Sequence, residues 1–369
     1  MPFLLTRKMM KSLLIIFFII IITSADANPE PLAPALYVMG DSLVDSGNNN
    51  FLPTVAKANF PPYGINFDGR RSTGRFTNGR TVADFIAEFV GLPYAPPYLS
   101  IRRLVESEQA ITGLNFASGS CGILPQTGAD LGKCLSFPEQ VELFEKTVKE
   151  DLPRYYKKSE EISDYLAKSL FVISIGSNDY INNYLNDLHD TSKRYSPQSF
   201  ATLLITNLSQ QLQRLYGLGA RKVLAFEIGP IGCIPSITRQ IQHNGPCVED
   251  INQLVVLFNN QLAAMLQNLT STLQHSSFIL GHVNGLGYDA AISPSKYGLS
   301  DSSNPCCVTW LNGTSGCIPG LGALACKQPD KHYFFDAFHL TESLYKHIAT
   351  LCFNSSSTCI PQNIKDLLL

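Results

Sequence analysis

Long hydrophobic runs, charge clusters and internal repeats are all scarce in this chain of 369 residues. Its 28 basic and 30 acidic residues nearly cancel, and lysine and arginine form no run beyond the N-terminus. This excludes the basic surface that nucleic-acid binding requires, so we expect no nucleic-acid partner. Because 45% of the residues are hydrophobic and no change in composition divides the chain, we expect residues 28–369 to form one large domain.

The long apolar run that does occur, Leu13–Ile22, lies near the N-terminus. Its ten residues are too few to cross a bilayer, which takes about 20. Basic residues precede the run, and the small residues Ala25 and Ala27 follow it at the spacing of a cleavage site. This order predicts a cleaved signal peptide over residues 1–27, with a signal anchor as the alternative. We therefore expect a secreted protein with no transmembrane segment in the mature chain.

The chain also lacks the cysteine spacing typical of zinc-binding sites, because its ten cysteines include no CxxC pair. In an oxidising compartment an even number of cysteines indicates disulfide bonds. The cysteines are Cys121, Cys134, Cys233, Cys247, Cys306, Cys307, Cys317, Cys326, Cys352 and Cys359. Cys121 lies near the site inferred below, and a disulfide is favoured there over a thiol nucleophile. Sequons at Asn207, Asn268, Asn312 and Asn354 permit N-glycosylation in the same compartment.

Short apolar segments rich in β-branched residues alternate with amphipathic segments along the chain. Such alternation predicts a parallel sheet with helices on both faces. The expected strands are Ala35–Met39, a weaker one at Gly113–Ala117, Leu170–Ile175, Lys222–Phe226 and Phe278–Val283. The expected helices are Thr81–Val90, Gln140–Leu152, Phe200–Tyr216, Asp250–Gln274 and Glu342–Phe353. Residues 284–331 are rich in Gly, Pro, Ser and Cys and are expected to form a disulfide-tied loop region.

Polar turns follow the first three of these strands. They are Gly40–Leu43, Ser118–Ser120 and Gly176–Asp179. In open α/β sheets ligands bind at the carboxyl ends of the strands, so we expect the turns to converge on one rim. Ser42 is the candidate nucleophile there. The N–H groups of Ser42 and Gly119 and the amide of Asn178 are the candidate donors to an oxyanion.

A serine hydroxyl is a weak nucleophile until a base removes its proton. Of the seven histidines, only His339 has a carboxylate three residues before it, that of Asp336. This spacing lets the carboxylate hold one imidazole nitrogen while the other faces the serine. The sequence therefore predicts an Asp336–His339–Ser42 site for nucleophilic catalysis.

Several ordered sequence blocks extend this hypothesis. They are ALYVMGDSLVDSGNNN (Ala35–Asn50), PPYG (Pro61–Gly64), TGRFTNGR (Thr73–Arg80), NFASG (Asn115–Gly119), GSND (Gly176–Asp179), GPIGC (Gly229–Cys233) and DxxHxTE (Asp336–Glu342). Together they resemble the GDSL esterase/lipase family, also called the SGNH hydrolases, and in particular its extracellular plant branch. The similarity covers residues 35–353, nearly all of the mature chain.

The resemblance implies a three-layer α/β/α, flavodoxin-like fold with a parallel central sheet and with no metal or organic cofactor. It assigns the nucleophile to Ser42, the base to His339, the orienting acid to Asp336, and oxyanion donors to Gly119 and Asn178. The implied activity is hydrolysis of a carboxylic ester, of a lipid or another acylated compound, in the apoplast or cell wall. Acyl transfer to an alcohol at the same site is the alternative. A non-catalytic binding protein is disfavoured, because all three catalytic residues are present.

The chain departs from the family pattern at Phe335, where tryptophan is usual, at Leu340, where proline is usual, and at Ser120-Cys121, where glycine is common. None of these departures removes a catalytic group. They are expected to affect loop stiffness and the acyl pocket.

Other polar residues have a structural interpretation. Asp45 and Asn48–Asn50 are expected to form a hydrogen-bonded turn that holds Ser42 in place, and Arg75 and Arg80 to anchor the same loop. We expect His282 to be a hydrogen-bonded core residue. Trp310, the sole tryptophan, either contacts a lipid chain or packs within the cysteine-rich loop.

Overall fold

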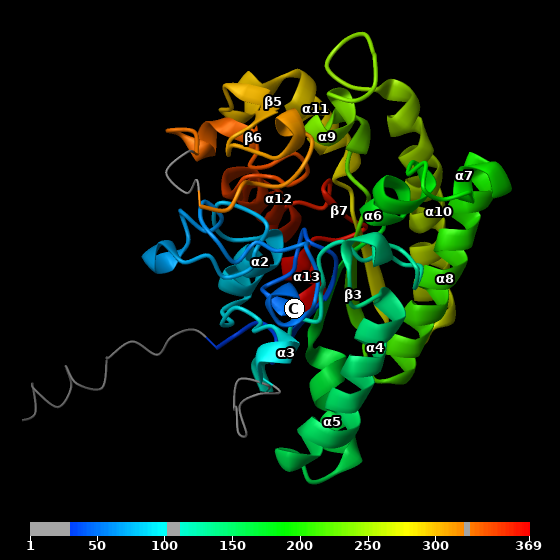
Figure 1. The fold of residues 1–369 in the computed structure, drawn as a ribbon. Coiled ribbons are helices and arrows are strands. Elements are labelled where there is room, and N and C mark those ends of the chain that lie inside the picture. The colour runs from blue at the N-terminus through cyan, green and yellow to red at the C-terminus, as the bar shows by residue number, and fades with distance from the viewer. Residues whose placement is uncertain (1–29, 102–110, 321–324) are drawn as a thin grey trace, which may run out of the picture.

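A computed structural model describes residues 30–101, 111–320 and 325–369 (Figure 1). The predicted signal peptide lies outside these residues. A five-stranded sheet forms the centre, in the order β1 (Leu36–Gly40), β2 (Leu170–Ser174), β3 (Lys222–Phe226), β4 (Ser277–Gly281) and β7 (Cys359–Ile360). Strands β1 to β4 are parallel, whereas β7 pairs antiparallel with β4 at the edge. The expected parallel sheet is confirmed, with one antiparallel edge strand that the sequence analysis did not predict.

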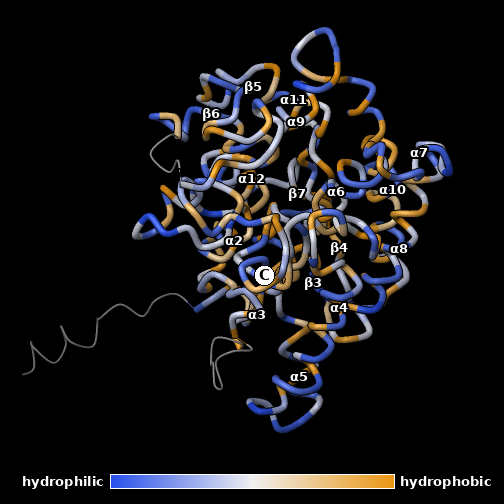
Figure 2. The backbone as a smooth tube through the Cα atoms, viewed as in Figure 1, coloured by the Kyte–Doolittle hydropathy of each residue, from blue (hydrophilic) through white to orange (hydrophobic). Residues whose placement is uncertain are grey.

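Helices cover both faces of this sheet. In Figure 1, α4 (Phe137–Lys146), α8 (Pro197–Gly217) and α10 (Glu249–Thr272) lie on one side, and α2 (Val82–Val90), α12 (Glu342–Asn354) and α13 (Ile364–Leu368) on the other. Every residue of β1 and β2 is buried, as strands enclosed on both faces require. Peripheral segments such as α7 (Thr191–Arg194) are mainly hydrophilic (Figure 2). The three-layer α/β/α architecture is therefore confirmed.

The main helices begin where the sequence provides caps. Asp84 in α2 accepts the N–H of Thr81 at 2.8 Å, and Glu139 in α4 accepts the N–H of Ser136 at the same distance, so both helices start with a capping box. The remaining helices are α3 (Tyr98–Ile101), α5 (Ser159–Lys168), α6 (Ser177–Asp179), α9 (Pro235–Thr238) and α11 (Asn284–Ile292). Within the described ranges, no helix is both long enough and apolar enough to cross a membrane.

The weaker expected strand, Gly113–Ala117, runs beside β1 without becoming a regular strand. Val38 donates its N–H to Leu114 and accepts the N–H of Phe116, at 2.9 and 2.8 Å. The Asn115 side chain competes with a regular ladder, because its Oδ1 accepts the N–H of Ala117 at 2.9 Å. The segment nevertheless delivers the turn that follows it to the carboxyl end of β1.

Residues 284–331 contain more regular structure than expected. Helix α11 occupies the first part, and β5 (Asp301–Pro305) pairs in parallel with β6 (His332–Phe334). Disulfides tie the rest, as predicted. All ten cysteines are paired, as Cys121–Cys134, Cys233–Cys247, Cys306–Cys326, Cys307–Cys317 and Cys352–Cys359. A small second core of Ala58, Tyr63, Phe76 and Phe335 packs around the Cys307–Cys317 bridge.

Candidate active site

Ser42 lies in the turn that leaves β1. Gly40 has φ +152°, and a Cβ there would lie 2.1 Å from the carbonyl oxygen of Ser174 in β2, so only glycine fits. The N–H of Asp41 donates to the same Ser174 oxygen at 3.0 Å, and Leu43 donates its N–H to Asp41 Oδ1 at 3.0 Å. These contacts hold Ser42 at the carboxyl edge of the sheet.

The residues after Ser42 brace this turn, as expected. Asp45 Oδ1 accepts the N–H groups of Gly47 and Asn48, both at 2.7 Å. Asn48 Nδ2 donates to the carbonyls of Asn115 and Ala117, at 2.9 and 2.8 Å. Asp45 and Asn48 are fully buried, so their polar groups serve the backbone and are not available to a substrate.

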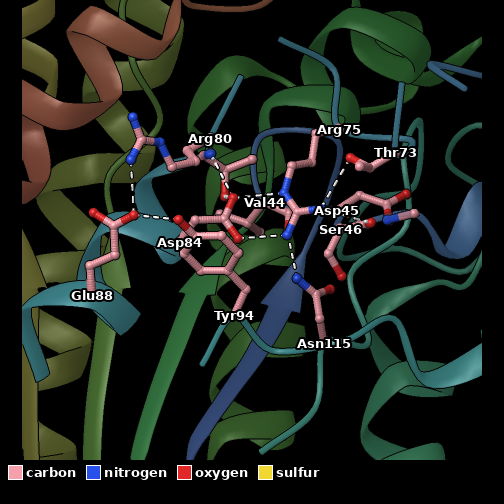
Figure 3. A network of polar contacts seen from close by, with 12 residues as sticks. Val44, Asp45, Ser46, Thr73, Arg75, Arg80, Asp84, Glu88, Tyr94 and Asn115 are labelled. Atoms are coloured by element: carbon pink, nitrogen blue, oxygen red, sulfur yellow. Dashed lines mark hydrogen bonds and ion pairs between the residues drawn. The ribbon is translucent and has the colours of Figure 1, made fainter. Parts of the chain in front are cut away.

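Arg75 fastens the same loop to α2 (Figure 3). Its guanidinium donates two hydrogen bonds to Asp84, at 2.6 and 2.7 Å, and a third to the carbonyl of Ser46 at 3.3 Å. Arg75 is 6% exposed, so this bidentate pair is shielded from water. The anchoring role predicted for Arg75 is confirmed.

Two other expectations are wrong. Arg80 does not hold the Ser42 loop; it pairs with Glu88, at 3.0 Å, and with Glu342, and so links α2 to α12. His282 is not a core residue, because its side chain is 52% exposed. It follows the end of β4, where its Nδ1 bonds to Glu227 at 2.8 Å. The apolar pattern predicts a strand that continues to Val283, whereas β4 ends at Gly281, so His282 lies outside the sheet.

Asp336 and His339 lie on a tight loop between β6 and α12. The N–H of Phe335 donates to the His339 carbonyl at 2.8 Å, and Asp336 Oδ1 accepts the N–H groups of Phe338 and His339, both at 2.8 Å. His339 Nδ1 lies 2.7 Å from Asp336 Oδ2, while Nε2 lies 2.7 Å from Ser42 Oγ. Because the carboxylate is an acceptor, Nδ1 carries the proton and the Nε2 lone pair faces the hydroxyl.

Tyr63 completes this arrangement and was missed by the sequence analysis. Its hydroxyl donates to Asp336 Oδ2 at 2.6 Å and accepts the N–H of Cys317 at 3.1 Å. Burial acts to raise the pKa of Asp336, but its contacts with His339 and Tyr63 more than offset this effect, and the pKa lies below its ordinary value. Tyr63 belongs to the PPYG block (Pro61–Gly64), which supports the family resemblance but does not reveal a contact with Asp336.

Gly119 is not placed as predicted. Its N–H donates to Asp45 Oδ2 at 3.2 Å, so this donor is already used and is not available to an oxyanion. The next residue, Ser120, has φ +70° and lines the cavity that contains Ser42. In the described part of the chain, the N–H groups of Ser42 and Ser120 have no acceptor. The absence of a side chain, which made Gly119 the expected donor, does not reveal where its N–H points.

Asn178 lies in α6, just beyond β2. Its Nδ2 donates to the carbonyl of Cys121 at 2.9 Å, and its Oδ1 accepts a hydrogen bond from Asn182 Nδ2 at 3.0 Å. An amide nitrogen has two hydrogens, so one N–H of Asn178 remains without a protein acceptor among the described residues. Asn178 lines the same cavity as Ser42, as predicted.

Asp179 ties α6 to the segment after Ser120. Its Oδ2 accepts the N–H of Ile123 at 2.7 Å, and its Oδ1 accepts the N–H of Leu124 at 3.0 Å and the hydroxyl of Thr127 at 2.7 Å. This fully buried carboxylate therefore fixes the two donor-bearing turns relative to one another.

A cavity of about 420 Å³ opens beside Ser42 and His339. Much of its wall is apolar, including Phe60, Ile181, Ile234 and Phe338. Trp310 lines it while remaining 53% exposed, so it does not pack inside the cysteine-rich loop. This shape suits an apolar chain attached to a polar reacting group.

Metal-binding side chains gather elsewhere in the described residues. Cys306, Cys326 and His332 place possible ligand atoms within 4.8 Å of one another. The two sulfurs are joined in a disulfide, so neither is available as a thiolate ligand.

Known proteins of one family are similar to this chain. The GDSL-like Lipase/Acylhydrolase family matches residues 36–351. The chain belongs to this family. Membership identifies it as a hydrolase of carboxylic esters. Among its relatives, GDSL esterase/lipase 7 from Arabidopsis thaliana is 46% identical over 338 residues, 89% of this chain and 90% of the relative.

A second relative and one solved structure were also found to be similar to the chain. A second Arabidopsis thaliana GDSL esterase/lipase is 43% identical and covers 90% of this chain and 87% of its own. A solved phospholipase A1 from Streptomyces albidoflavus aligns with 86% of this GDSL hydrolase and 97% of its own chain, at 12% identity and a TM-score of 0.39.

Proposed function

We propose that this GDSL hydrolase cleaves its ester through an acyl-enzyme on Ser42, with His339 as the base and Asp336 as the orienting acid. The observation that carries the proposal is the continuous contact from Asp336 Oδ2 through the imidazole to Ser42 Oγ, with 2.7 Å at each step. Such a chain is the arrangement that activates a serine hydroxyl.

In the first step His339 Nε2 takes the proton of Ser42 as Oγ attacks the ester carbonyl. The resulting oxyanion accepts hydrogen bonds from the N–H of Ser42, the N–H of Ser120 and the free N–H of Asn178. The imidazolium then protonates the leaving alcohol. Water, activated by the same imidazole, hydrolyses the acyl-enzyme and regenerates Ser42.

The acyl group we propose is an apolar chain, as in a lipid or another acylated compound. The apolar cavity wall supports this, as do two exposed hydrophobic residues that line the cavity, Val55 at 76% and Trp310 at 53% exposure. Exposed apolar side chains next to a reactive group favour an apolar substrate over a charged one.

Secretion belongs to the same proposal. Its support is the apolar N-terminal run together with five disulfides that use every cysteine. Of the four sequons, Asn268, Asn312 and Asn354 are exposed and are the proposed glycosylation sites. Asn207 is half-buried in α8, and its Nδ2 donates a hydrogen bond to the carbonyl oxygen of Leu203 at 2.8 Å. It is therefore the least accessible of the four asparagines for attachment of a glycan.

The test uses purified, glycosylated wild type and Ser42→Ala with a series of p-nitrophenyl esters of increasing acyl length. We expect Ser42→Ala to lose about 10⁴-fold or more of kcat with its melting temperature unchanged. A folded Ser42→Ala protein with near wild-type turnover would contradict the assigned nucleophile. Product analysis with and without an added alcohol distinguishes hydrolysis from acyl transfer.

A further inference from the structure

Asn182 makes contacts that the mechanism above leaves unexplained. It lies one turn after Asn178, in the π-helical turn Tyr180–Tyr184, and lines the active-site cavity. Its Nδ2 donates to Asn178 Oδ1 at 3.0 Å and approaches the carbonyl oxygen of Ser120 at 3.4 Å. We propose that Asn182 is a positioning residue that sets the orientation of the Asn178 amide and joins it to the Ser120 turn.

The orientation of Asn178 decides whether it helps or hinders the reaction. A carboxamide presents either N–H or C=O on a given side, and the two orientations have nearly the same shape. With Nδ2 toward the cavity, Asn178 donates to the oxyanion. After a flip, Oδ1 would face the oxyanion and repel it.

Two neighbours together specify the productive orientation. The Cys121 carbonyl can only accept, so it selects the amide nitrogen, at 2.9 Å. Asn182 Nδ2 can only donate, so it selects the amide oxygen. A correctly oriented amide requires no reorganisation as charge develops, which is the condition for strong electrostatic stabilisation.

Through its contact with Ser120, Asn182 also helps to position a second oxyanion donor, the N–H of Ser120. Ser120 adopts φ +70°, a conformation that side-chain-bearing residues rarely occupy, and so needs support from its surroundings. Asn182 lies close to its carbonyl, while the Ser120 N–H has no acceptor among the residues that the structure describes. In the described part of the chain, the Asn182 side-chain amide bonds to Asn178 and Ser120 alone.

This inference rests on the proposed function, and its test is the substitution Asn182→Asp. A carboxylate cannot donate to Asn178 Oδ1 and repels it, so the substitution favours the flipped amide. We expect kcat to fall about 100-fold, the effect of losing one oxyanion donor, with KM changed less than about twofold. Asn182→Ala, which loses the donor without adding repulsion, should lower kcat about tenfold.

The matched control is Asn186→Asp, the same change one turn further on. Asn186 does not line the cavity; its Oδ1 accepts the N–H of Leu188 at 3.0 Å, and its Nδ2 contacts the backbone carbonyl of Asn182 at 3.5 Å, not the Asn182 side chain. We expect kcat of Asn186→Asp to stay within about twofold of wild type, because the hydrogen bonds of the Asn182 side chain to Asn178 and Ser120 remain in place. Equal losses in both Asp variants would show a general charge effect and overturn the inference.

A second readout separates positioning from substrate contact. An alkyl boronic acid forms a tetrahedral adduct with an active-site serine and places an oxygen in the oxyanion hole. Its Kd should rise in Asn182→Asp by the same factor as kcat falls, while Kd for a non-hydrolysable ether analogue of the ester stays constant. An increase in KM or in the ether Kd, with kcat unchanged, would make Asn182 a substrate contact instead. Wild type without turnover or boronate binding would overturn the proposed function itself.

Discussion

The two sides of the active site are held in place by different means. Ser42, Ser120 and Asn178 lie on turns at the carboxyl edge of the main sheet, and buried side chains brace these turns through backbone hydrogen bonds. Asp336 and His339 lie on a loop after β6, a strand of three residues, and depend on Tyr63 and the neighbouring Cys307–Cys317 bridge. We call these the nucleophile side and the base side.

This difference predicts on which side a substitution should lower activity more. The geometry of the nucleophile side follows from the register of the parallel strands. Many contacts between these strands therefore contribute to the position of Ser42. The base side is fixed by hydrogen bonds within its own loop and by side-chain contacts among Tyr63, Phe76 and Phe335, within a core separate from the main one. Loss of a single contact on the base side should therefore lower activity more than loss of a similar buried contact beneath the nucleophile.

Among substitutions that leave Ser42 in place, the largest effect should come from Asp336→Asn. An amide in place of this carboxylate leaves the shape unchanged but no longer fixes Nδ1 as the protonated nitrogen of His339. We expect kcat to fall about 10⁴-fold at neutral pH. Steady-state kinetics on a short acyl ester, with circular dichroism to verify the fold, measures this loss. Retention of a tenth or more of the activity would show that Asp336 does not orient the base.

The corresponding break on the nucleophile side is Asn178→Ala. It removes one of three proposed oxyanion donors and leaves Ser42 and His339 in contact. We expect kcat to fall about 100- to 1,000-fold with KM nearly constant, because the donor acts on the transition state. Pre-steady-state measurement of acylation should show the same factor. A raised KM at unchanged kcat would place Asn178 among the substrate contacts.

A matched pair of tyrosines sharpens the comparison. Tyr63→Phe removes the hydrogen bond to Asp336 and the one accepted from the N–H of Cys317, and Tyr37→Phe removes a buried hydrogen bond to Tyr165, of 3.0 Å, beneath the nucleophile side. The free energy of unfolding should fall by roughly 1 kcal/mol for each hydrogen bond lost. We expect kcat/KM to fall about tenfold for Tyr63→Phe alone, because only Tyr63 contacts the catalytic acid.

Thermal unfolding and kinetics of the two phenylalanine variants test this directly. Equal activity in both variants, at similar losses of stability, would mean that the base side is as redundantly supported as the nucleophile side.

Much of the fold could be predicted from the sequence because its strands are short, apolar and separated by helical patterns. Segments governed by side-chain hydrogen bonds were the exceptions. Asn115 bonds to its own neighbours, and so Gly113–Ala117 failed to become a regular strand. Likewise, no periodicity reveals the pairing of β5 with β6, which joins segments on either side of the disulfide-tied loop.

The sequence predicts which residues form most of the site, but it does not predict the hydrogen-bond partners of those residues. Ser42 and Asn178 meet as expected because turns at one sheet edge converge, and Asp336 and His339 reach Ser42 from the loop after β6. The choice between Gly119 and Ser120 was decided by which N–H Asp45 accepts, a contact 74 residues apart in sequence. Tyr63 reaches Asp336 across 273 residues, and no local pattern encodes such a contact.

The last prediction concerns stability, not turnover, and compares two buried carboxyl groups, one on each side. Asp336 has several donors and a pKa below its ordinary value. Asp41 is 1% exposed and accepts one N–H at Oδ1, while its Oδ2 has no partner among the described residues. Burial therefore raises the pKa of Asp41 to about 7, from an ordinary value of 3.8.

The sign of the pH dependence follows from this shift. Between about pH 4 and pH 7 the folded protein keeps a proton on Asp41 that the unfolded chain releases, so Asp41 favours folding increasingly as pH falls. Asp41→Asn carries no titrating group and should lose this slope, by roughly 1 kcal/mol per pH unit. Urea unfolding of both proteins at pH 5, 6 and 7 measures the difference. If the free energy of unfolding depends on pH equally in wild type and Asp41→Asn, Asp41 is ionised in the folded protein. The buried carboxyl groups of the two sides would then not differ in the direction of their pKa shifts.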